Sequence, residues 1–195
     1  MRVDGLLLSA GAGTRMGRPK ALVASADGNG WLPTTLARLR EGGCERLTVV
    51  LGASADEAAR LVPDDVRVVV APDWAEGMGA SLRAGVAGLD RDADAVLVTL
   101  VDLPDVSADV VRRVVTAATG PGGLARATYE GAPGHPVLIG RDHWDGVAAS
   151  AAGDTGARDY LAARVVTAVE CGDLATGRDV DEPSGATGIR TVRRP

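Results

Sequence analysis

The sequence of 195 residues contains no phenylalanine, and aromatic residues make up only 3% of it. Its core must therefore be built from aliphatic side chains, as is usual for parallel sheets covered by helices. The two cysteines, Cys44 and Cys171, lie too far apart in sequence to indicate a disulfide framework or a metal site. A reducing compartment is expected. The length predicts one domain, residues 1–195.

Long apolar runs and basic clusters are also missing. No apolar stretch approaches the roughly 18 residues that a membrane-spanning helix needs, and the N-terminus does not read as a signal peptide. The net charge is −5 and the 21 basic residues are scattered, whereas binding a nucleic-acid backbone requires clustered Lys and Arg. We therefore predict no membrane partner, no nucleic-acid partner and a cytoplasmic location.

Short aliphatic runs alternate with helical patterns along the chain. Strands buried on both faces are predicted at Val3–Ser9, Leu47–Leu51, 66–70 and 95–101, and weaker strands at Leu124–Tyr129, 137–139 and 165–169. Helices are predicted at 34–40, 54–61, 81–89, 107–119, 141–151 and 154–163. This alternation indicates an α/β fold with a mostly parallel sheet. We expect the tail after residue 183 to be poorly ordered.

Two of these helices have clear boundary signals. The helix over residues 34–40 is followed by Gly42-Gly43, which is a good stop signal. The helix over residues 54–61 opens with Ser54 and, three residues later, Glu57, which is the spacing of a capping box.

The loop after the first strand is the strongest functional signal. Gly11, Gly13 and Gly17 let the backbone approach a ligand closely, and successive N–H groups in such a turn form an anion-binding nest. Arg15 and Lys20 add two cations, a combination that suits a polyphosphate. The spacing Gly-x-Gly-x-x-x-Gly is one residue too long for a dinucleotide fingerprint, and the P-loop sequence is not matched either.

Two acidic motifs are candidates for a metal site. Asp102 follows a buried strand, and open α/β sheets bind ligands at that end of their strands. Its carboxylate is suited to Mg²⁺, although an aspartate before Pro104 also fits a turn or a helix cap. Asp179 and Asp181 form a second acidic group, and alternate residues of an extended segment point to opposite faces. Only one of these two is therefore expected to reach a metal.

Residues 8–22 match the complete pattern L-x-A-G-x-G-x-R-M-G-x-P-K-A-L, a signature of nucleotidyltransferases that act on sugar nucleotides and cofactors. Together with residues 72–85, 134–138 and 153–158, this loop resembles the molybdenum cofactor cytidylyltransferase family. The resemblance implies a three-layer α/β/α, Rossmann-like nucleotidyltransferase fold. It also implies transfer of CMP from CTP to molybdopterin, with Mg²⁺ as cofactor and pyrophosphate as a product, and a molybdoenzyme as a partner.

The same resemblance assigns roles to residues. Lys20, Arg15 and Asp102 are expected in catalysis, and Asp102 and Asp181 as metal ligands, with Asp179 structural. The expected acceptor site consists of Gly134, His135 and Pro136. The nucleoside triphosphate is expected to contact Ser9, Ala10, Gly11, Ala12, Gly13, Arg15, Lys20, Gly79 and Ser81.

Two other functions stay open. An NAD(P)H-dependent oxidoreductase on the same scaffold is supported only by the glycine-rich loop, whose spacing does not suit it. A non-catalytic protein that binds and delivers the molybdenum cofactor would keep the fold and show no turnover. Lys20 and Asp102 argue against this function, whereas Glu182-Pro183-Ser184 departs from the family pattern Thr-Pro-Glu and argues mildly for it.

Overall fold

Strands form one central sheet in the computed structural model, which describes residues 1–25 and 28–181. Within these residues the sheet has seven strands in the order β3-β2-β1-β4-β6-β5-β7. Only the pairings that involve β6 are antiparallel. The strands are β1 (Val3–Ser9), β2 (Leu47–Leu51), β3 (Arg67–Val70), β4 (Ala95–Leu100), β5 (Leu124–Tyr129), β6 (Ala132–Gly140) and β7 (Thr167–Glu170).

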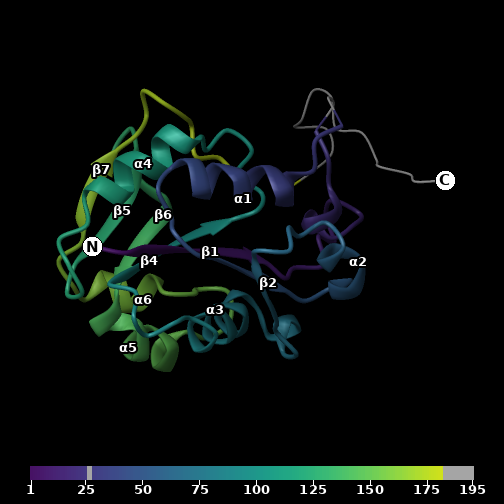
Figure 1. Cartoon of the computed structure of the whole chain (residues 1–195), viewed down its shortest axis with the longest axis horizontal. Coiled ribbons are helices and arrows are strands. Elements are labelled where there is room, and N and C mark those ends of the chain that lie inside the picture. Colours follow the sequence, from purple (N-terminus) through teal and green to yellow (C-terminus); the bar gives the residue numbers. More distant parts are fainter. Residues whose placement is uncertain (26–27, 182–195) are drawn as a thin grey trace.

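Helices cover both faces of this sheet. Figure 1 shows α1 and α4 on one face and α3, α5 and α6 on the other, which confirms the predicted three-layer α/β/α arrangement. The α-helices are α1 (Trp31–Glu41), α2 (Ala55–Ala59), α3 (Met78–Ala87), α4 (Ala108–Thr116), α5 (Trp144–Ser150) and α6 (Arg158–Ala162). The tail after residue 183, for which poor order was predicted, lies outside the described residues.

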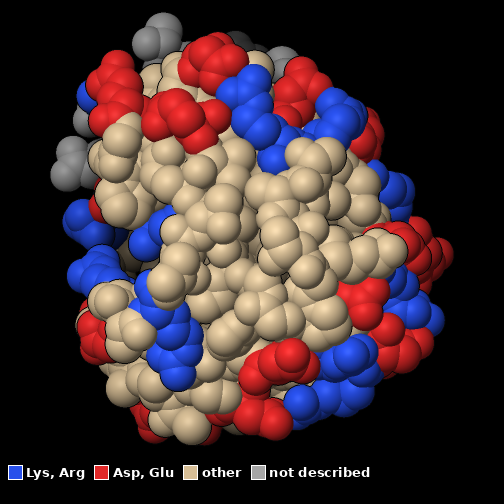
Figure 2. All heavy atoms as spheres, turned by 90° about the vertical axis from the view of Figure 1, so that its left-hand side faces the viewer, with Lys and Arg blue, Asp and Glu red and all other residues tan. Residues whose placement is uncertain are grey.

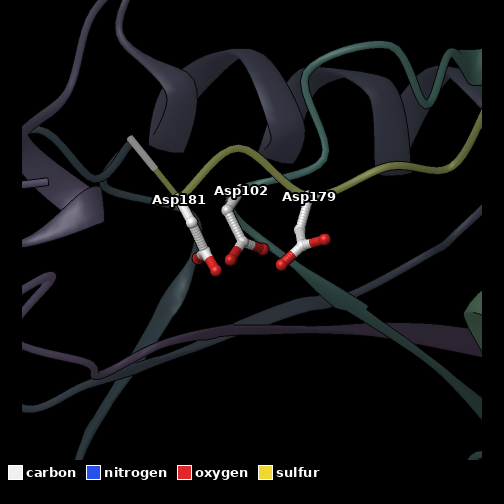
Figure 3. Close-up of side chains that lie close together, drawn as sticks. All are labelled: Asp102, Asp179 and Asp181. Carbon is white, nitrogen blue, oxygen red and sulfur yellow. The ribbon is translucent and has the colours of Figure 1, made fainter. Parts of the chain in front are cut away.

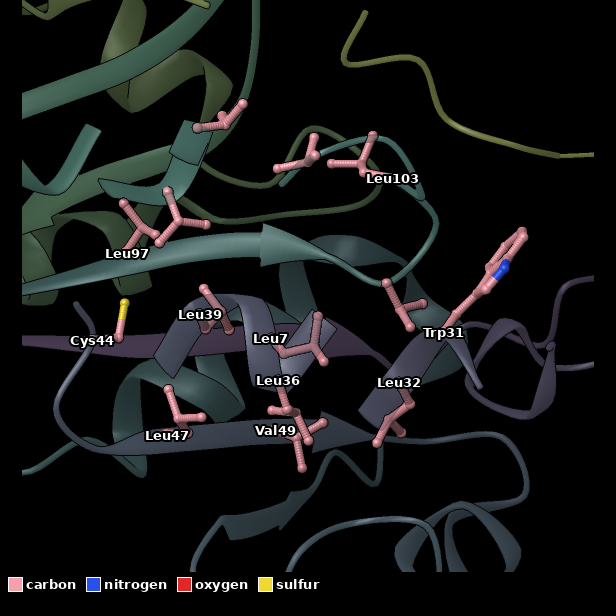
Figure 4. Packing of buried hydrophobic residues seen from close by; sticks show 14 of the residues in the cluster. Leu7, Trp31, Leu32, Leu36, Leu39, Cys44, Leu47, Val49, Leu97 and Leu103 are labelled. Carbon is pink, nitrogen blue, oxygen red and sulfur yellow. The ribbon is translucent and has the colours of Figure 1, made fainter. Parts of the chain in front are cut away.

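The core is aliphatic, as the lack of phenylalanine predicts. Two buried clusters lie on the two faces of the sheet. In the first, side chains of α1 pack on β1 and β2, and Leu36, Leu7 and Val49 have no exposed surface (Figure 4). Burying one such side chain contributes about 1.5–3 kcal/mol. In the second, the indole of the fully buried Trp144 donates a hydrogen bond to the carbonyl oxygen of Ile139 at 3.0 Å.

The order of the strands determines where a ligand site can form. From β1 the sheet continues to β2 and β3 on one side, whereas β4 pairs with β1 on the other, with Leu8 opposite Leu100. The strand order therefore reverses between β1 and β4: β2 and β3 extend the sheet on one side of β1, and β4 begins the other side. In open α/β sheets, ligands bind at the carboxyl ends of the strands at such a switch point.

Two predictions near the β2–β3 edge were wrong. Ser54 lies in the left-handed region at φ 54°, and its side chain makes no capping hydrogen bond, so no capping box forms and α2 is shorter than predicted. The strand predicted over residues 66–70 was expected to be buried on both faces. Instead, β3 forms the edge of the sheet, and Val70 is 56% exposed because only β2 pairs with this strand.

The second half of the sheet contains a hairpin that the sequence pattern hides. β5 turns into β6 at Glu130 and Gly131, which have φ values of 52° and 79°. Only residues 137–139 were predicted as a strand, but β6 begins at Ala132 and includes Pro133 and Pro136. Prolines are uncommon within strands, and they interrupt the apolar pattern here.

The helix α3 also differs from the prediction. It begins three residues earlier than predicted, at Met78.

The surface carries charges of both signs. Figure 2 shows Lys and Arg interspersed with Asp and Glu around the margin of one face, and mostly uncharged residues in its middle. Among the described residues, no helix is long and apolar enough to cross a membrane.

Candidate active site

The loop after β1 folds back on itself beside the end of β4. Gly13 has φ 60°, and a side chain there would overlap the carbonyl oxygen of Arg18. The N–H of Arg18 donates to the carbonyl oxygen of Gly13 at 3.2 Å, which closes the turn. Within the described part of the chain, the N–H groups of residues 11–15 donate to no backbone carbonyl. Gly11, Gly13, Thr14 and Arg15 line a cavity, and backbone donors of this kind suit an anion.

Lys20 lies at the start of the short 3₁₀ turn Lys20–Leu22 and reaches the carboxylates at the end of β4. Its Nζ is 2.6 Å from Oδ2 of Asp102 and 2.6 Å from Oδ1 of Asp181. Burial lowers the pKa of Lys20, but the hydrogen bonds to these two carboxylates outweigh burial, so the pKa lies above its ordinary value. Lys20 is therefore a charged ammonium that neutralises part of an acidic site.

Three carboxylates meet at this point. Figure 3 shows the carboxylate of Asp102, at the end of β4, between those of Asp179 and Asp181. One oxygen from each lies within 4.8 Å of the others. Sequence alternation predicted that only one of the last two reaches a metal, but both bring a carboxylate oxygen close to Asp102, whose carbonyl oxygen accepts the N–H of Val180 at 3.0 Å.

The donor set of this cluster fits a hard divalent cation. Mg²⁺ and Mn²⁺ favour carboxylate oxygens as ligands. One oxygen of Asp102 accepts from Lys20, whereas Oδ1 is buried and has no hydrogen-bond partner among the described residues. A buried acceptor without a partner costs about 1–3 kcal/mol unless something satisfies it. An ion beside Oδ1 would satisfy it.

A strap of chain from Cys171 to Asp181 brings two of the acids to the site. Thr176 is anchored through its N–H and its hydroxyl, which both donate to Oδ2 of Asp105, at 2.7 and 2.5 Å. Arg15 contacts the other end of the strap, with its NH1 2.5 Å from Oδ2 of Asp181. The Lys20 hydrogen bond is the main cause that lowers the pKa of Asp181, with Arg15 a smaller one.

A cavity of about 380 Å³ lies between the loop, the three 3₁₀ residues Trp74–Glu76 and the first turn of α3. Its lining includes Ser9, Trp74 and Ser81 as well as Lys20 and Asp102. The hydroxyl of Ser9 is buried without a partner in the described chain, so it is free to bond a ligand. Of the predicted nucleotide contacts, Ser9, Ala10, Gly11, Gly13, Arg15, Lys20 and Ser81 line this cavity.

Two of the predicted nucleotide contacts lie outside this lining. The N–H of Gly79 donates to the carbonyl oxygen of Gly153 at 2.7 Å, and a side chain at Gly79 would meet the backbone of Ala152 at 2.6 Å. Gly79 therefore lets α3 pack closely against the loop before α6. Ala12 is the other predicted contact that does not line the cavity, although it belongs to the loop after β1.

A second cavity, of about 530 Å³, lies next to the first and shares Leu8, Met78, Leu100 and Asp154 with it. Of the predicted acceptor residues, Gly134 and His135 line it and Pro136 does not. Burial lowers the pKa of His135 to about 4, with Arg126 a smaller cause, so the ring is neutral at pH 7. The prediction missed Arg126, although an arginine within an otherwise apolar strand was a visible signal.

The fold and this site define an α/β protein of the nucleotidyltransferase class, with a glycine-rich loop and an acidic cluster at the switch point. Residues 5–169 match the model of the MobA-like NTP transferase domain. The chain belongs to this family.

Two curated relatives point to different activities. A nicotine blue oxidoreductase from Paenarthrobacter nicotinovorans is 37% identical over 190 residues, which cover 92% of each chain. A molybdenum cofactor guanylyltransferase from Rhodobacter capsulatus is 31% identical over 149 residues, or 74% of this chain and 66% of that one.

Solved structures agree with the fold. The homologue of Mycobacterium tuberculosis Rv0371c from Mycobacterium sp. strain JC1 superposes with a TM-score of 0.79 at 27% identity, over 93% of this chain and 92% of that one. A complex of Mycobacterium tuberculosis Rv0371c with manganese gives a TM-score of 0.72 at 25% identity, over 88% of both chains.

Proposed function

We propose that this chain transfers a nucleoside monophosphate from a nucleoside triphosphate to a phosphorylated small-molecule acceptor such as molybdopterin. An oxygen of the acceptor phosphate attacks the α-phosphorus, the bond from the α-phosphorus to the bridging oxygen breaks, and pyrophosphate leaves with the electron pair. The observation that carries the proposal is Lys20 held between Asp102 and Asp181, beside a loop whose N–H groups have no backbone acceptor in the described chain.

The residues that line the first cavity divide the work of binding the triphosphate. The N–H groups of residues 11–15 cradle its phosphates, and Ser9, Ala10 and Ser81 contact the nucleotide. Lys20 stabilises charge on the α-phosphate, and Arg15, whose side chain is 71% exposed, stabilises the departing pyrophosphate. Such reactions depend on positioning and on charge stabilisation. A phosphate nucleophile is already ionised at neutral pH, so no catalytic His or Cys is needed.

Asp102 and Asp181 would hold a divalent ion, with Asp179 close enough to contribute a third oxygen. Mg²⁺ is the ion we propose, and the manganese complex of Rv0371c supports a divalent ion in this family. When bound, the ion would offset negative charge on the phosphates. The carboxylates would then balance the ion, and Lys20 would be released to contact the nucleotide.

The donor nucleotide is proposed to be CTP. This choice rests on Ala10-Gly11 in the first loop, which resembles the cytidylyl branch of the family. The relatives from Rhodobacter capsulatus and Rhodopirellula baltica are guanylyltransferases, the latter described as probable, and they favour GTP. Both triphosphates therefore belong in the first assay.

An NAD(P)H-dependent oxidoreductase is the second candidate, and the 37% identical nicotine blue oxidoreductase is the observation that favours it. The same N–H groups suit the pyrophosphate of a dinucleotide. A hydride transfer, however, gives no purpose to three converging carboxylates, two of which contact Lys20. The acidic cluster is thus the feature that separates the two reactions.

Pyrophosphate release from CTP or GTP, with molybdopterin and Mg²⁺, tests the proposal. We expect release that depends on the acceptor and falls about 100-fold in Asp102→Asn, the size of effect seen when transition-state charge stabilisation is removed. Asp64→Asn, which removes an exposed carboxylate in a turn, is the control and should keep full activity. Equal release by both variants, or NADPH oxidation without pyrophosphate, would reject the proposal.

A further inference from the structure

The second cavity contains cations that the reaction at Asp102 does not use. Arg126 projects from β5 and Arg158 from the start of α6, on the sheet face that α3, α5 and α6 cover (Figure 1). Neither side chain makes an ion pair or a hydrogen bond within the described residues, and Nε of Arg126 is buried without a partner.

Carboxylates lie in the same lining but do not neutralise these arginines. Asp154 and Asp179 line the cavity on the side of the acidic cluster. Burial, with Arg158 as a smaller cause, lowers the pKa of Arg126, and Arg126 in turn contributes to the low pKa of His135. Arg126 is half-buried and Arg158 is exposed, so the cost of an unpaired charge falls mainly on Arg126. A bound anion is what would compensate for this cost.

The rest of the lining describes the body of the ligand. Five apolar side chains, which we call the apolar floor, line the same cavity as the arginines: Leu82, Val98, Val137, Ile139 and Leu161. The acceptor phosphate must reach Lys20 and Asp102 in the first cavity, so a group at the arginines belongs to the other end of the acceptor. An acceptor that fits both cavities has an apolar or ring-shaped body between two polar ends.

We propose that Arg126 and Arg158 form an anion-binding subsite that takes an anionic group at the end of the acceptor remote from the attacking phosphate. The assignment to the acceptor rests on the proposed function. The anion site itself does not, because it needs neither the metal nor the nucleotide. Guanidinium groups bind phosphate and carboxylate alike, and here the apolar floor favours an anion attached to a ring.

The sequence has only two histidines, so ¹⁵N-histidine labelling gives one reporter in the cavity, His135, and one internal control, His143. Phenyl phosphate and benzoate are titrated at pH 7 in EDTA without nucleotide, with phenol as the neutral probe. We expect both anions to shift the His135 ring signals and phenol to have no effect. A stronger response to one anion identifies the charged group that the subsite prefers.

Arg126→Met is expected to weaken phenyl phosphate binding at least tenfold. Arg60→Met should leave it unchanged, because Arg60 directly follows α2, is exposed and has no side-chain partner among the described residues. Arg126→Met is also expected to raise the melting temperature, because it removes a half-buried charge that burial disfavours. If Arg126 had a structural role instead, the substitution would lower the melting temperature. Arg158→Met tests the subsite independently at an exposed position, with the same expected loss.

Wild-type binding in both Arg126→Met and Arg158→Met would overturn the subsite, as would silence of His135 with both anions. If the wild-type protein binds the anions but releases no pyrophosphate, the proposed transfer is rejected and the anion subsite stands. If the subsite and the proposed transfer are both correct, Arg126→Met raises the KM for the acceptor and leaves the KM for the triphosphate unchanged. An unchanged KM for the acceptor would remove the link between the subsite and the reaction.

Discussion

Lys20 is the single lysine of the chain, whereas arginine supplies all of the other 20 cations. Its ammonium lies 2.6 Å from each of two carboxylate oxygens of different residues. A compact ammonium makes such contacts with separate partners, while a planar guanidinium favours one carboxylate held through two parallel bonds. The choice of lysine at this position therefore fits the geometry of the site.

The pKa of Lys20 gives a prediction at this scale. Folding raises the pKa, so the stabilisation from its ion pairs is present below the ordinary value of 10.5 and is lost as the pH rises through the folded value. In Asp102→Asn the pKa of Lys20 should fall, because one of the two carboxylates is gone. Reductive ¹³C-methylation labels only Lys20 and the terminal amine, and NMR titration gives both pKa values.

The same titration of Asp64→Asn should match the wild-type protein. An unchanged Lys20 pKa in Asp102→Asn would show that the ammonium does not contact Asp102 in solution.

Single residues of this site were predicted to different degrees. The motif at residues 8–22 places Arg15 and Lys20 correctly in one loop, because the spacing along a loop is local information. Asp179 was taken as structural from the family resemblance, and alternation along an extended segment predicted that only one of Asp179 and Asp181 reaches a metal. The two carboxylates come together where the N–H of Val180 donates to the carbonyl oxygen of Asp102, a contact between residues about 80 positions apart that no local pattern contains.

At the scale of elements, α1 and α4 approach each other closely at Gly42. Its backbone is helical, with φ −78°, so an alanine is not strained there, but the added methyl group would overlap the side chain of Val111. Gly42→Ala should lower the free energy of unfolding by about 1–3 kcal/mol, the usual cost of overpacking. Urea denaturation measures this change.

Gly122→Ala is the matched control, because the nearest atom to its added methyl group is 3.8 Å away. Its effect should stay within about 0.5 kcal/mol. Equal effects of the two substitutions would mean that the helices are not in contact at Gly42.

Glu170, at the end of β7, holds the β5–β6 hairpin. Its carboxylate accepts the N–H groups of Gly172 and Glu130 at 2.9 Å, the hydroxyl of Thr128 at 2.8 Å and the N–H of Gly131 at 3.1 Å. These bonds, led by the one from Gly172, lower the pKa of Glu170 from 4.5 to about 2. The negative charge therefore stabilises the hairpin.

Because the folded pKa is lowered, this stabilisation is present above about pH 4.5 and is lost as the pH falls towards 2. Glu170→Gln should therefore be less stable than the wild-type protein at pH 6, and the difference should shrink at pH 2.5. Urea unfolding at both values measures it, with Glu41→Gln as an exposed control. A difference that does not change with pH would contradict the predicted role of the charge.

The elements of the first half of the sheet were predicted better than those of the second. β1 and β2 are buried on both faces, so their continuous aliphatic runs identify them from sequence alone. β6 is exposed at its start and is interrupted by Pro133 and Pro136, and the short strand β7 is mostly exposed, so neither has that signature. The edge position of β3 was also invisible, because strand order is a property of the whole sheet.

For the whole molecule, the topology brings the β1 loop, the end of β4 and the strap before Asp181 to one edge of the sheet. The two cavities lie side by side there and share a wall. A triphosphate in one and an acceptor in the other would meet at Asp102. This arrangement gives the protein the geometry of a two-substrate transferase.

Calorimetric titration of CTP and GTP, with and without Mg²⁺, tests this account most directly, with NADPH as the comparison. We predict that a triphosphate binds only with Mg²⁺, that Asp102→Asn loses this binding, and that Asp64→Asn keeps it. Binding of NADPH without any metal dependence, together with no binding of either triphosphate, would contradict the account and favour the oxidoreductase.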